Sequence, residues 1–151
     1  MNKKELYRNS LQQIEGITDG ESNLIANLAN ITAILKQNLG YFWTGFYLVE
    51  GEELVLGPFQ GSPACVRIAK GKGVCGTCWS EKQTQLVADV HAFPGHIACD
   101  AQSQSEIVVP VLNASGEVVM VLDIDHDTKG AFDETDRENL ESLALHIQKL
   151  L

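Results

Sequence analysis

Four cysteines gather in one glycine-rich region of the chain, at Cys65, Cys75, Cys78 and Cys99. A thiolate can act as a nucleophile, a metal ligand or a redox group, so such a cluster is a candidate functional site. The charged, amphipathic first residues lack the apolar core of a signal peptide, and we therefore expect a cytoplasmic protein. In that compartment clustered cysteines more often indicate metal or redox chemistry than structural disulfides.

A zinc site is the first interpretation of these residues. Two residues separate Cys75 from Cys78. Two also separate His96 from Cys99, and together the pairs have the spacing of a four-ligand zinc site. However, a strand is predicted between the pairs, which is unlike a compact zinc knuckle, and a chain of 151 residues needs no metal to form a core. A zinc deaminase is excluded more clearly, because the His-x-Glu motif is absent.

A thioredoxin-like motif is the second interpretation, because residues 75–78 (CGTC) have the Cys-x-x-Cys length. Such motifs follow a strand in a βαβ unit, whereas this one lies in a glycine-rich loop. We therefore do not expect a thioredoxin-like fold.

A peroxidatic-type cycle is the third interpretation. One thiolate attacks an oxidised substrate, becomes a sulfenic acid and condenses with a second cysteine, and nearby acids protonate the departing oxygen. Cys99 is followed by Asp100, and three more acids lie on the predicted strands beyond it: Glu106, Asp123 and Asp125. Asp123 and Asp125 share one face of their strand. Because acids are costly to bury without a partner, the alternative is that they lie at a solvated strand end.

The elements that position these residues indicate an α+β fold with a mostly antiparallel sheet. Apolar residues at helical spacing predict two helices at the start of the chain, separated at 18–20, and one at its end that begins near Asp133. Two hairpins are predicted, 42–50 with 53–59 and 106–112 with 117–125. We expect residues 1–151 to form a single domain, with the helices packed on one face of the sheet and the cysteine-bearing region on the other.

Residues 61–105 are predicted to be largely irregular, with a helical turn near 75–82 and a strand near 85–88. This region is far longer than the usual connection of about 4–6 residues, and long ordered loops tend to be functional.

The charge of the chain limits its partners. There are 20 acidic against 11 basic residues, a net charge of −9, which repels a phosphate backbone and excludes nucleic acid as an expected partner. No basic amphipathic face indicates membrane docking.

Four segments of the chain resemble one enzyme family: WTGFYL at 43–48, KGKGVCG at 70–76, HIACDAQSQSEIVVPV at 96–111 and VLDID at 121–125. They resemble the free methionine-(R)-sulfoxide reductases, which are built on a GAF-domain fold. The resemblance runs from the second predicted helix to the last one. It implies thiol-dependent reduction of free methionine-(R)-sulfoxide in a homodimer, with recycling by thioredoxin and with no bound cofactor or metal.

The resemblance also implies roles for three cysteines. Cys99 matches the residue that attacks the sulfoxide. Cys65 and Cys75 match the other two, and either could close a disulfide with Cys99, although we favour Cys65. Cys78 lies outside the family pattern and is either a bystander or part of the relay.

The substrate would be held by four further side chains. The resemblance implies that Trp43 forms the wall against the substrate methyl group. The ammonium group of the substrate would bind to Glu106, Asp123 and Asp125, and one of these acids would protonate the sulfoxide oxygen. Backbone amides of residues 95–104 would hold its carboxylate.

Two other classes of protein remain as alternatives. One is a non-enzymatic GAF-type sensor of a small ligand or of redox state. The other is a zinc-binding domain that uses Cys75, Cys78, His96 and Cys99.

Overall fold

The computed structural model describes residues 1–97 and 99–151. Four α-helices are described, α1 (Lys3–Thr18), α2 (Leu24–Leu39), α3 (Gly73–Glu81) and α4 (Glu134–Lys149), with a short 3-10 helix, η1 (Val90–Ala92). The strands are β1 (Trp43–Glu50), β2 (Glu53–Gln60), β3 (Arg67–Ala69), β4 (Gln85–Val87), β5 (Ser105–Leu112) and β6 (Val118–His126). These strands form one antiparallel sheet in the order β3-β2-β1-β6-β5-β4.

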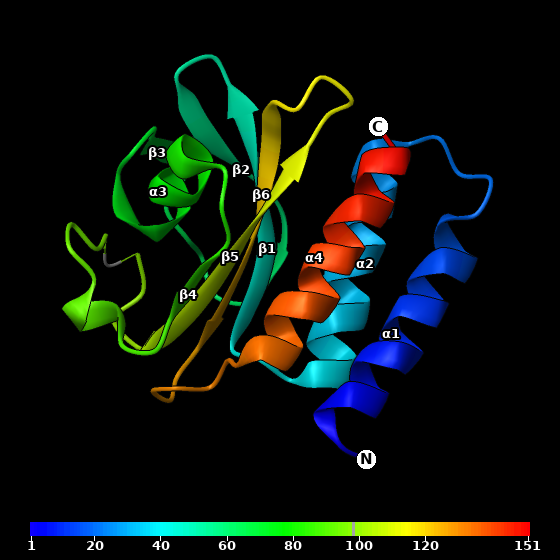
Figure 1. The fold of residues 1–151 in the computed structure, drawn as a ribbon, viewed down its shortest axis with the longest axis horizontal. Coiled ribbons are helices and arrows are strands. Elements are labelled where there is room, and N and C mark those ends of the chain that lie inside the picture. Colours follow the sequence, from blue (N-terminus) through cyan, green and yellow to red (C-terminus); the bar gives the residue numbers. More distant parts are fainter. Residues whose placement is uncertain (98) are drawn as a thin grey trace.

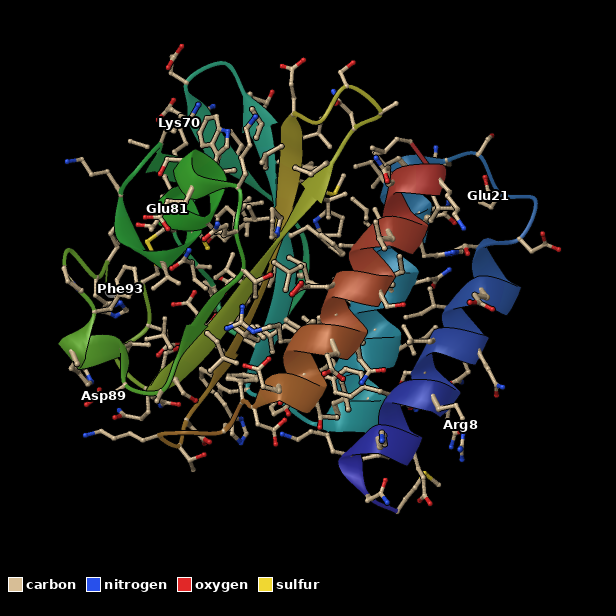
Figure 2. The ribbon with its side chains drawn as sticks, in the orientation of Figure 1. Arg8, Glu21, Lys70, Glu81, Asp89 and Phe93 are labelled. Carbon is tan, nitrogen blue, oxygen red and sulfur yellow. A yellow bond between two sulfur atoms is a disulfide. The ribbon has the colours of Figure 1, made fainter. Side chains whose placement is uncertain are left out.

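Helices from both ends of the chain lie on the same side of the sheet (Figure 1). Their apolar faces and the facing strand residues form one core, which includes Tyr7, Ile14, Leu28, Ile31, Ile107, Leu122, Leu140 and Ile147. Figure 2 shows Arg8 and Glu21 on the outer side of this layer, and both side chains are exposed. The predicted α+β architecture is confirmed. Within the described residues, no helix combines the length and apolar character needed to span a membrane.

The opposite side of the sheet carries α3, η1 and the connections around them (Figure 1). A second core lies there, formed by Trp43, Tyr47, Leu54, Val74, Cys75, Cys78, Trp79, Val108 and Val121. Side chains alternate between the two faces along each central strand, as the period of two requires. On β1, for example, Phe46 belongs to the helix side, while Trp43 and Tyr47 belong to the other.

The predicted hairpins and terminal helices are found close to their expected bounds. Asp133 caps α4, and its side chain accepts from the backbone amide of Asp136 while Asp136 accepts from the amide of Asp133. The central region contains more structure than predicted: β3 pairs with β2, and α3 begins at Gly73. The three residues of β3 are too few for an alternating pattern to indicate a strand.

A buried carboxylate joins the first and last helices. Asp136 is 0% exposed, and its side chain accepts hydrogen bonds from the hydroxyls of Tyr7 at 2.6 Å and Tyr41 at 2.7 Å. Lys3 Nζ lies 2.7 Å from its other oxygen. These contacts tie α1, α4 and the approach to β1 together at one charged group.

We expect Asp136→Ala to lower the free energy of unfolding by about 3 kcal/mol, because it leaves two buried hydroxyls and an ammonium without their acceptor. Asp136→Asn should lose less, because its amide oxygen still accepts a hydrogen bond. Urea denaturation gives both values. Glu134→Ala, at an exposed position of the same helix turn, is the control and should change the free energy by less than about 0.5 kcal/mol. A loss below about 1 kcal/mol in Asp136→Ala would show that this junction does not hold the helices together.

Candidate functional site

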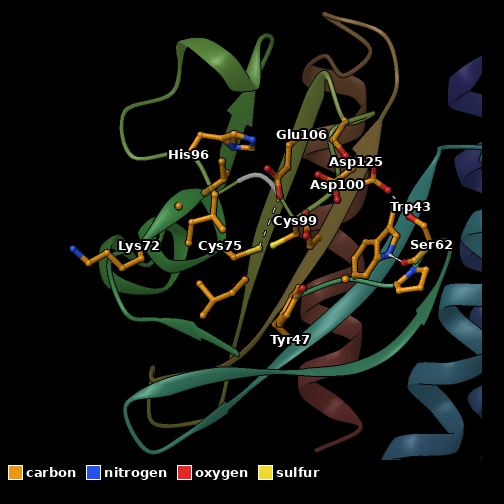
Figure 3. Close-up of a pocket in the computed structure, with 18 residues that line it drawn as sticks. Trp43, Tyr47, Ser62, Lys72, Cys75, His96, Cys99, Asp100, Glu106 and Asp125 are labelled. Carbon is orange, nitrogen blue, oxygen red and sulfur yellow. Dashed lines mark hydrogen bonds between the residues drawn. The ribbon is translucent and has the colours of Figure 1, made fainter. Parts of the chain in front are cut away.

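A pocket opens on the α3 side of the sheet, between the central strands and the loops above them (Figure 3). Strand β1 contributes Trp43 and Tyr47, α3 contributes Cys75, and a loop contributes Cys99. Three carboxyl groups come from β5 and β6: Glu106, Asp123 and Asp125. The structure therefore brings together side chains that the sequence places as much as 82 positions apart, from Trp43 to Asp125.

The pairing of β5 with β6 brings the three acids together. Glu106 lies opposite Asp125, and Asp123 lies opposite Val108, two residues further along β5. Glu106 and Asp123 are 6% and 5% exposed, while Asp125 is partly buried. The alternative of a solvated strand end, which concerned Asp123 and Asp125, is therefore wrong for Asp123.

Burial raises the pKa of all three carboxyl groups well above their usual values, and their mutual repulsion raises each pKa further. The charge of Asp123 acts on Glu106, that of Asp125 acts on Asp123, and that of Glu106 acts on Asp125. Asp123 Oδ1 is buried and has no hydrogen-bond partner among the described residues. The group can therefore hold protons at a pH at which an isolated carboxyl group is ionised, or exchange them for a bound cation.

The cysteines occupy three different environments. Cys65 and Cys99 form a disulfide, with their Cα atoms 5.4 Å apart. The buried thiol of Cys75 points at Glu106, with 4.0 Å between Sγ and Oε2, and desolvation followed by the nearby Asp123 charge raises its pKa well above the usual value. Cys78 is fully buried, and its thiol points at the backbone oxygen of Val108, 3.6 Å away.

The zinc interpretation is not supported by this arrangement. Cys99 is covalently bound to Cys65, and the Cys78 thiol points at a strand carbonyl. Within residues 1–97 and 99–151, the group that could hold a metal consists instead of Cys75, Glu106 and Asp123. His96 lies at the edge of the pocket, and its Nδ1 has no hydrogen-bond partner among the described residues. Burial lowers the pKa of His96 below its usual value, so the ring is neutral at pH 7.

Two aromatic residues of β1, Trp43 and Tyr47, hold the loop that carries Cys65. Trp43 Nε1 donates to the backbone oxygen of Ser62, and the Tyr47 hydroxyl donates to that of Cys65, each at 2.9 Å. Gly61 begins this loop with a φ of +144°, and a Cβ there would lie 2.5 Å from the Trp43 ring. Tyr47 was not predicted as a site residue from the sequence. The signal that could have found it is strand alternation, because Tyr47 lies four positions after Trp43 and therefore on the same face of the strand.

The pKa of Asp100 is shifted in the opposite direction from those of Glu106, Asp123 and Asp125. Its carboxylate accepts a hydrogen bond from Ser62 Oγ at 2.6 Å and one from the amide of Gln102 at 2.8 Å. The Ser62 hydrogen bond, followed by that of Gln102, lowers its pKa. Asp100 is therefore ionised at neutral pH, so the acids suited to donate a proton are those on the strands.

Known proteins share both the sequence and the shape of this chain. Residues 22–151 match the GAF domain family. GAF domain-containing protein A of Dictyostelium discoideum is 56% identical over 93% of this chain and 89% of its own length. Free methionine-R-sulfoxide reductase of Escherichia coli is 46% identical over 100% of this chain and 92% of its own length. The structure of free methionine-R-sulfoxide reductase from Neisseria meningitidis, in complex with its substrate, has a TM-score of 0.96 and 49% identity, covering 99% of this chain and 90% of that one.

We expect Asp123→Asn to change the pH dependence of stability. A carboxyl group whose pKa is raised in the folded state contributes stability below its unfolded pKa of about 4, and this contribution is lost as the pH rises through the folded pKa. The neutral amide does not titrate. The melting temperature of Asp123→Asn relative to wild type should therefore be higher at pH 8 than at pH 5.

Calorimetry of the disulfide form at both pH values measures this difference, which we expect to exceed about 2 °C, the shift that corresponds to somewhat under 1 kcal/mol for a chain of this size. Glu117→Gln, at an exposed turn between β5 and β6, is the control and should show the same difference from wild type at both values. A relative melting temperature of Asp123→Asn that stays constant or falls toward pH 8 would contradict a raised carboxyl pKa.

Proposed function

The chain belongs to the GAF-domain family and, within it, to the free methionine-(R)-sulfoxide reductases, and from this premise we propose how its pocket reduces the sulfoxide. The chain is an oxidoreductase that acts on a sulfur group. We propose free methionine-(R)-sulfoxide as the substrate and Cys99 as the attacking residue. The observation that carries this proposal is the disulfide between Cys65 and Cys99 at the edge of a pocket floored by three acids.

The first half of the reaction consumes the sulfoxide. The Cys99 thiolate attacks the sulfoxide sulfur, and a carboxylic acid of the pocket protonates the sulfoxide oxygen. The resulting hydroxyl passes from the substrate sulfur to the Cys99 sulfur as the transient bond between the two sulfur atoms breaks, which releases methionine and leaves Cys99 as a sulfenic acid. This step needs an acid that is neutral at the working pH. The raised pKa values of Glu106 and Asp123, due to burial, support these two residues as proton donors.

The same pocket offers partners for each end of the substrate. The substrate ammonium binds to those of Glu106, Asp123 and Asp125 that are ionised, while another of the three keeps the proton that it donates to the sulfoxide oxygen. Trp43 lies against the methyl group. Backbone amides of residues 95–104 hold the substrate carboxylate, although Ala98 of that loop lies outside the described residues.

The second half of the reaction restores the enzyme. The Cys65 thiol attacks the Cys99 sulfenic acid to form the disulfide with loss of water, and thioredoxin then reduces this disulfide by thiol exchange. The disulfide found between these two residues supports Cys65 as the resolving cysteine. Cys75, whose buried thiol faces Glu106, remains the alternative partner, and we treat Cys78 as a bystander because its thiol faces a strand carbonyl.

The proposal extends to the oligomeric state of the protein and to its cellular compartment. We propose a homodimer that contacts its partner through the helix layer, where Ile17, Ile25 and Leu145 are 48%, 54% and 64% exposed. Residues 1–151 act as one domain, without a bound cofactor or metal. Recycling by thioredoxin requires a reducing compartment, which supports a cytoplasmic location.

We expect the purified protein to oxidise NADPH in the presence of thioredoxin and thioredoxin reductase when free methionine-(R)-sulfoxide is added. The free S epimer and a peptide-bound sulfoxide should give no turnover, and Cys99→Ser should abolish the activity because the attacking sulfur is missing. The absence of activity on all three substrates, with the reductant shown to be competent, would contradict the proposal and favour the sensor alternative. Activity that survives in Cys99→Ser would move the attack to another cysteine.

We expect Cys65→Ser to form one equivalent of methionine per chain and then stop, because its sulfenic acid has no resolving thiol. Dimedone labelling followed by mass spectrometry should find the sulfenic acid on Cys99. Cys78→Ser is the matched control and should turn over normally with thioredoxin. If Cys75 closes the disulfide instead, the sulfenic acid will accumulate in Cys75→Ser and not in Cys65→Ser.

A further inference from the structure

Two loops bring the cysteines of the disulfide to the edge of the pocket. Residues 61–66 follow β2 and carry Cys65, and residues 99–104 precede β5 and begin with Cys99. Besides the disulfide, one side-chain hydrogen bond joins these loops in the described part of the chain, from Ser62 Oγ to Asp100 Oδ2 at 2.6 Å. Figure 3 shows Ser62 and Asp100 on the Trp43 side of the pocket.

The hydrogen bond and the disulfide bridge the same gap. Ser62 stands three positions before Cys65, and Asp100 stands directly after Cys99. A contact at this place limits how far the two sulfur atoms can separate once the bond between them is reduced. No periodic pattern of the sequence connects these two residues, because they lie in separate loops.

The loop that carries Cys65 is firmly held by the sheet. Its backbone oxygens at Ser62 and Cys65 accept hydrogen bonds from Trp43 and Tyr47, each at 2.9 Å. The Val66 oxygen accepts one from the amide of β2 residue Leu56, also at 2.9 Å. Ser62 therefore offers its hydroxyl from a fixed position.

Among the described residues, the start of the loop that carries Cys99 makes hydrogen bonds to nearby residues of the same segment and none to the sheet, and the Cys99 amide itself donates to the backbone oxygen of Ile97 at 3.1 Å. Asp100 accepts from Gln102 at 2.8 Å through its side chain and from Ser103 at 3.3 Å through its backbone, and both bonds are local to the loop. The Ser62 hydroxyl lowers the pKa of Asp100 below its usual value, so the Asp100 carboxylate is fully ionised at neutral pH. An ionised acceptor makes this hydrogen bond stronger than one between neutral groups.

We propose that the hydrogen bond between Ser62 and Asp100 positions Cys99 beside Cys65 in the reduced enzyme, and so favours closure of the disulfide. This inference rests on the proposed function and deepens its recycling half. Ser62 and Asp100 are positioning residues that act through the two cysteines.

The step that this contact assists is balanced within the chain. The Cys65 sulfur attacks the Cys99 sulfur, the S–O bond of the sulfenic acid breaks, and the hydroxide takes up the thiol proton and leaves as water. Cys65 and Cys99 end as a disulfide, and no further oxidant is needed. Holding two loops together raises the effective concentration of one thiol at the other, which increases both the rate and the equilibrium constant of closure.

Ser62→Ala tests the proposal in a measurement that uses no sulfoxide. The full chain is equilibrated in dithiothreitol buffers of increasing oxidised fraction, and the disulfide between Cys65 and Cys99 is quantified by thiol alkylation and mass spectrometry. We expect the equilibrium to shift toward the dithiol form by about five- to tenfold, the effect of losing one partly exposed hydrogen bond to a charged group. Ser80→Ala, which removes an exposed hydroxyl of α3, is the matched control and should not shift it.

Variants of Asp100 distinguish loss of this hydrogen bond from general disruption of the loop. Asp100→Asn should shift the equilibrium less than Asp100→Ala, because its amide can still donate to the Ser62 oxygen. In the double variant of Ser62→Ala and Asp100→Ala, the shift should be close to that of Asp100→Ala alone, because one contact is removed in both. Additive shifts would overturn the proposal, and so would an unchanged equilibrium in Ser62→Ala.

Rapid quenching after one equivalent of free methionine-(R)-sulfoxide separates the two halves of the reaction. In Ser62→Ala, closure of the disulfide should slow more than methionine formation does, whereas an equal slowing of both would contradict a role confined to closure. If no methionine forms even in the wild type, the proposed function fails while the equilibrium shift still decides the positioning role. If methionine forms and the equilibrium does not shift, the positioning role alone fails.

Discussion

Strands β5 and β6 are paired so that Glu106 lies opposite Asp125 and Val108 opposite Asp123. The pocket depends on this pairing, because it places three carboxyl groups on one face of the sheet while Ile107, Leu122 and Ile124 enter the core on the other. A shift of one residue in β6 would exchange Asp123 and Asp125 with Leu122 and Ile124 and bury two acids against the helices. Packing of the apolar residues on the helix side therefore fixes the polar arrangement of the pocket.

The pocket divides its chemistry between a rigid part on helices and paired strands and a second part on loops. The acids and Trp43 stand on paired strands, where backbone hydrogen bonds on both sides restrict their movement. The disulfide cysteines stand on loops, which suits residues that must first face a substrate and then each other. Cys75 belongs to the rigid part, since it lies in α3 with its thiol against Glu106.

Some features of the sheet and of the pocket can be predicted from the sequence, and each prediction has its own physical basis. Alternation along the strands predicts that Asp123 and Asp125 share a face, and tight turns predict the antiparallel hairpins. Alternation does not show whether acids in an apolar strand are buried, because the end of a strand can be solvated or covered by a distant loop. No local rule decides whether Cys65 or Cys75 reaches Cys99, and β3 is too short to show a period. The pairing of loops is a tertiary property, and in this chain both the disulfide and the Ser62 contact depend on it.

The junction at Asp136 has a consequence for where the domain can be said to begin. The match to the GAF domain starts at residue 22, which leaves α1 outside it. Yet α1 supplies Lys3 and Tyr7 to a carboxylate that is fully buried within the matched region. A chain trimmed to the family boundary would retain every residue of the pocket but would leave this negative charge with Tyr41 as its remaining side-chain donor among the described residues. The first helix, although it touches no part of the chemistry, is therefore an electrostatic requirement of the last one.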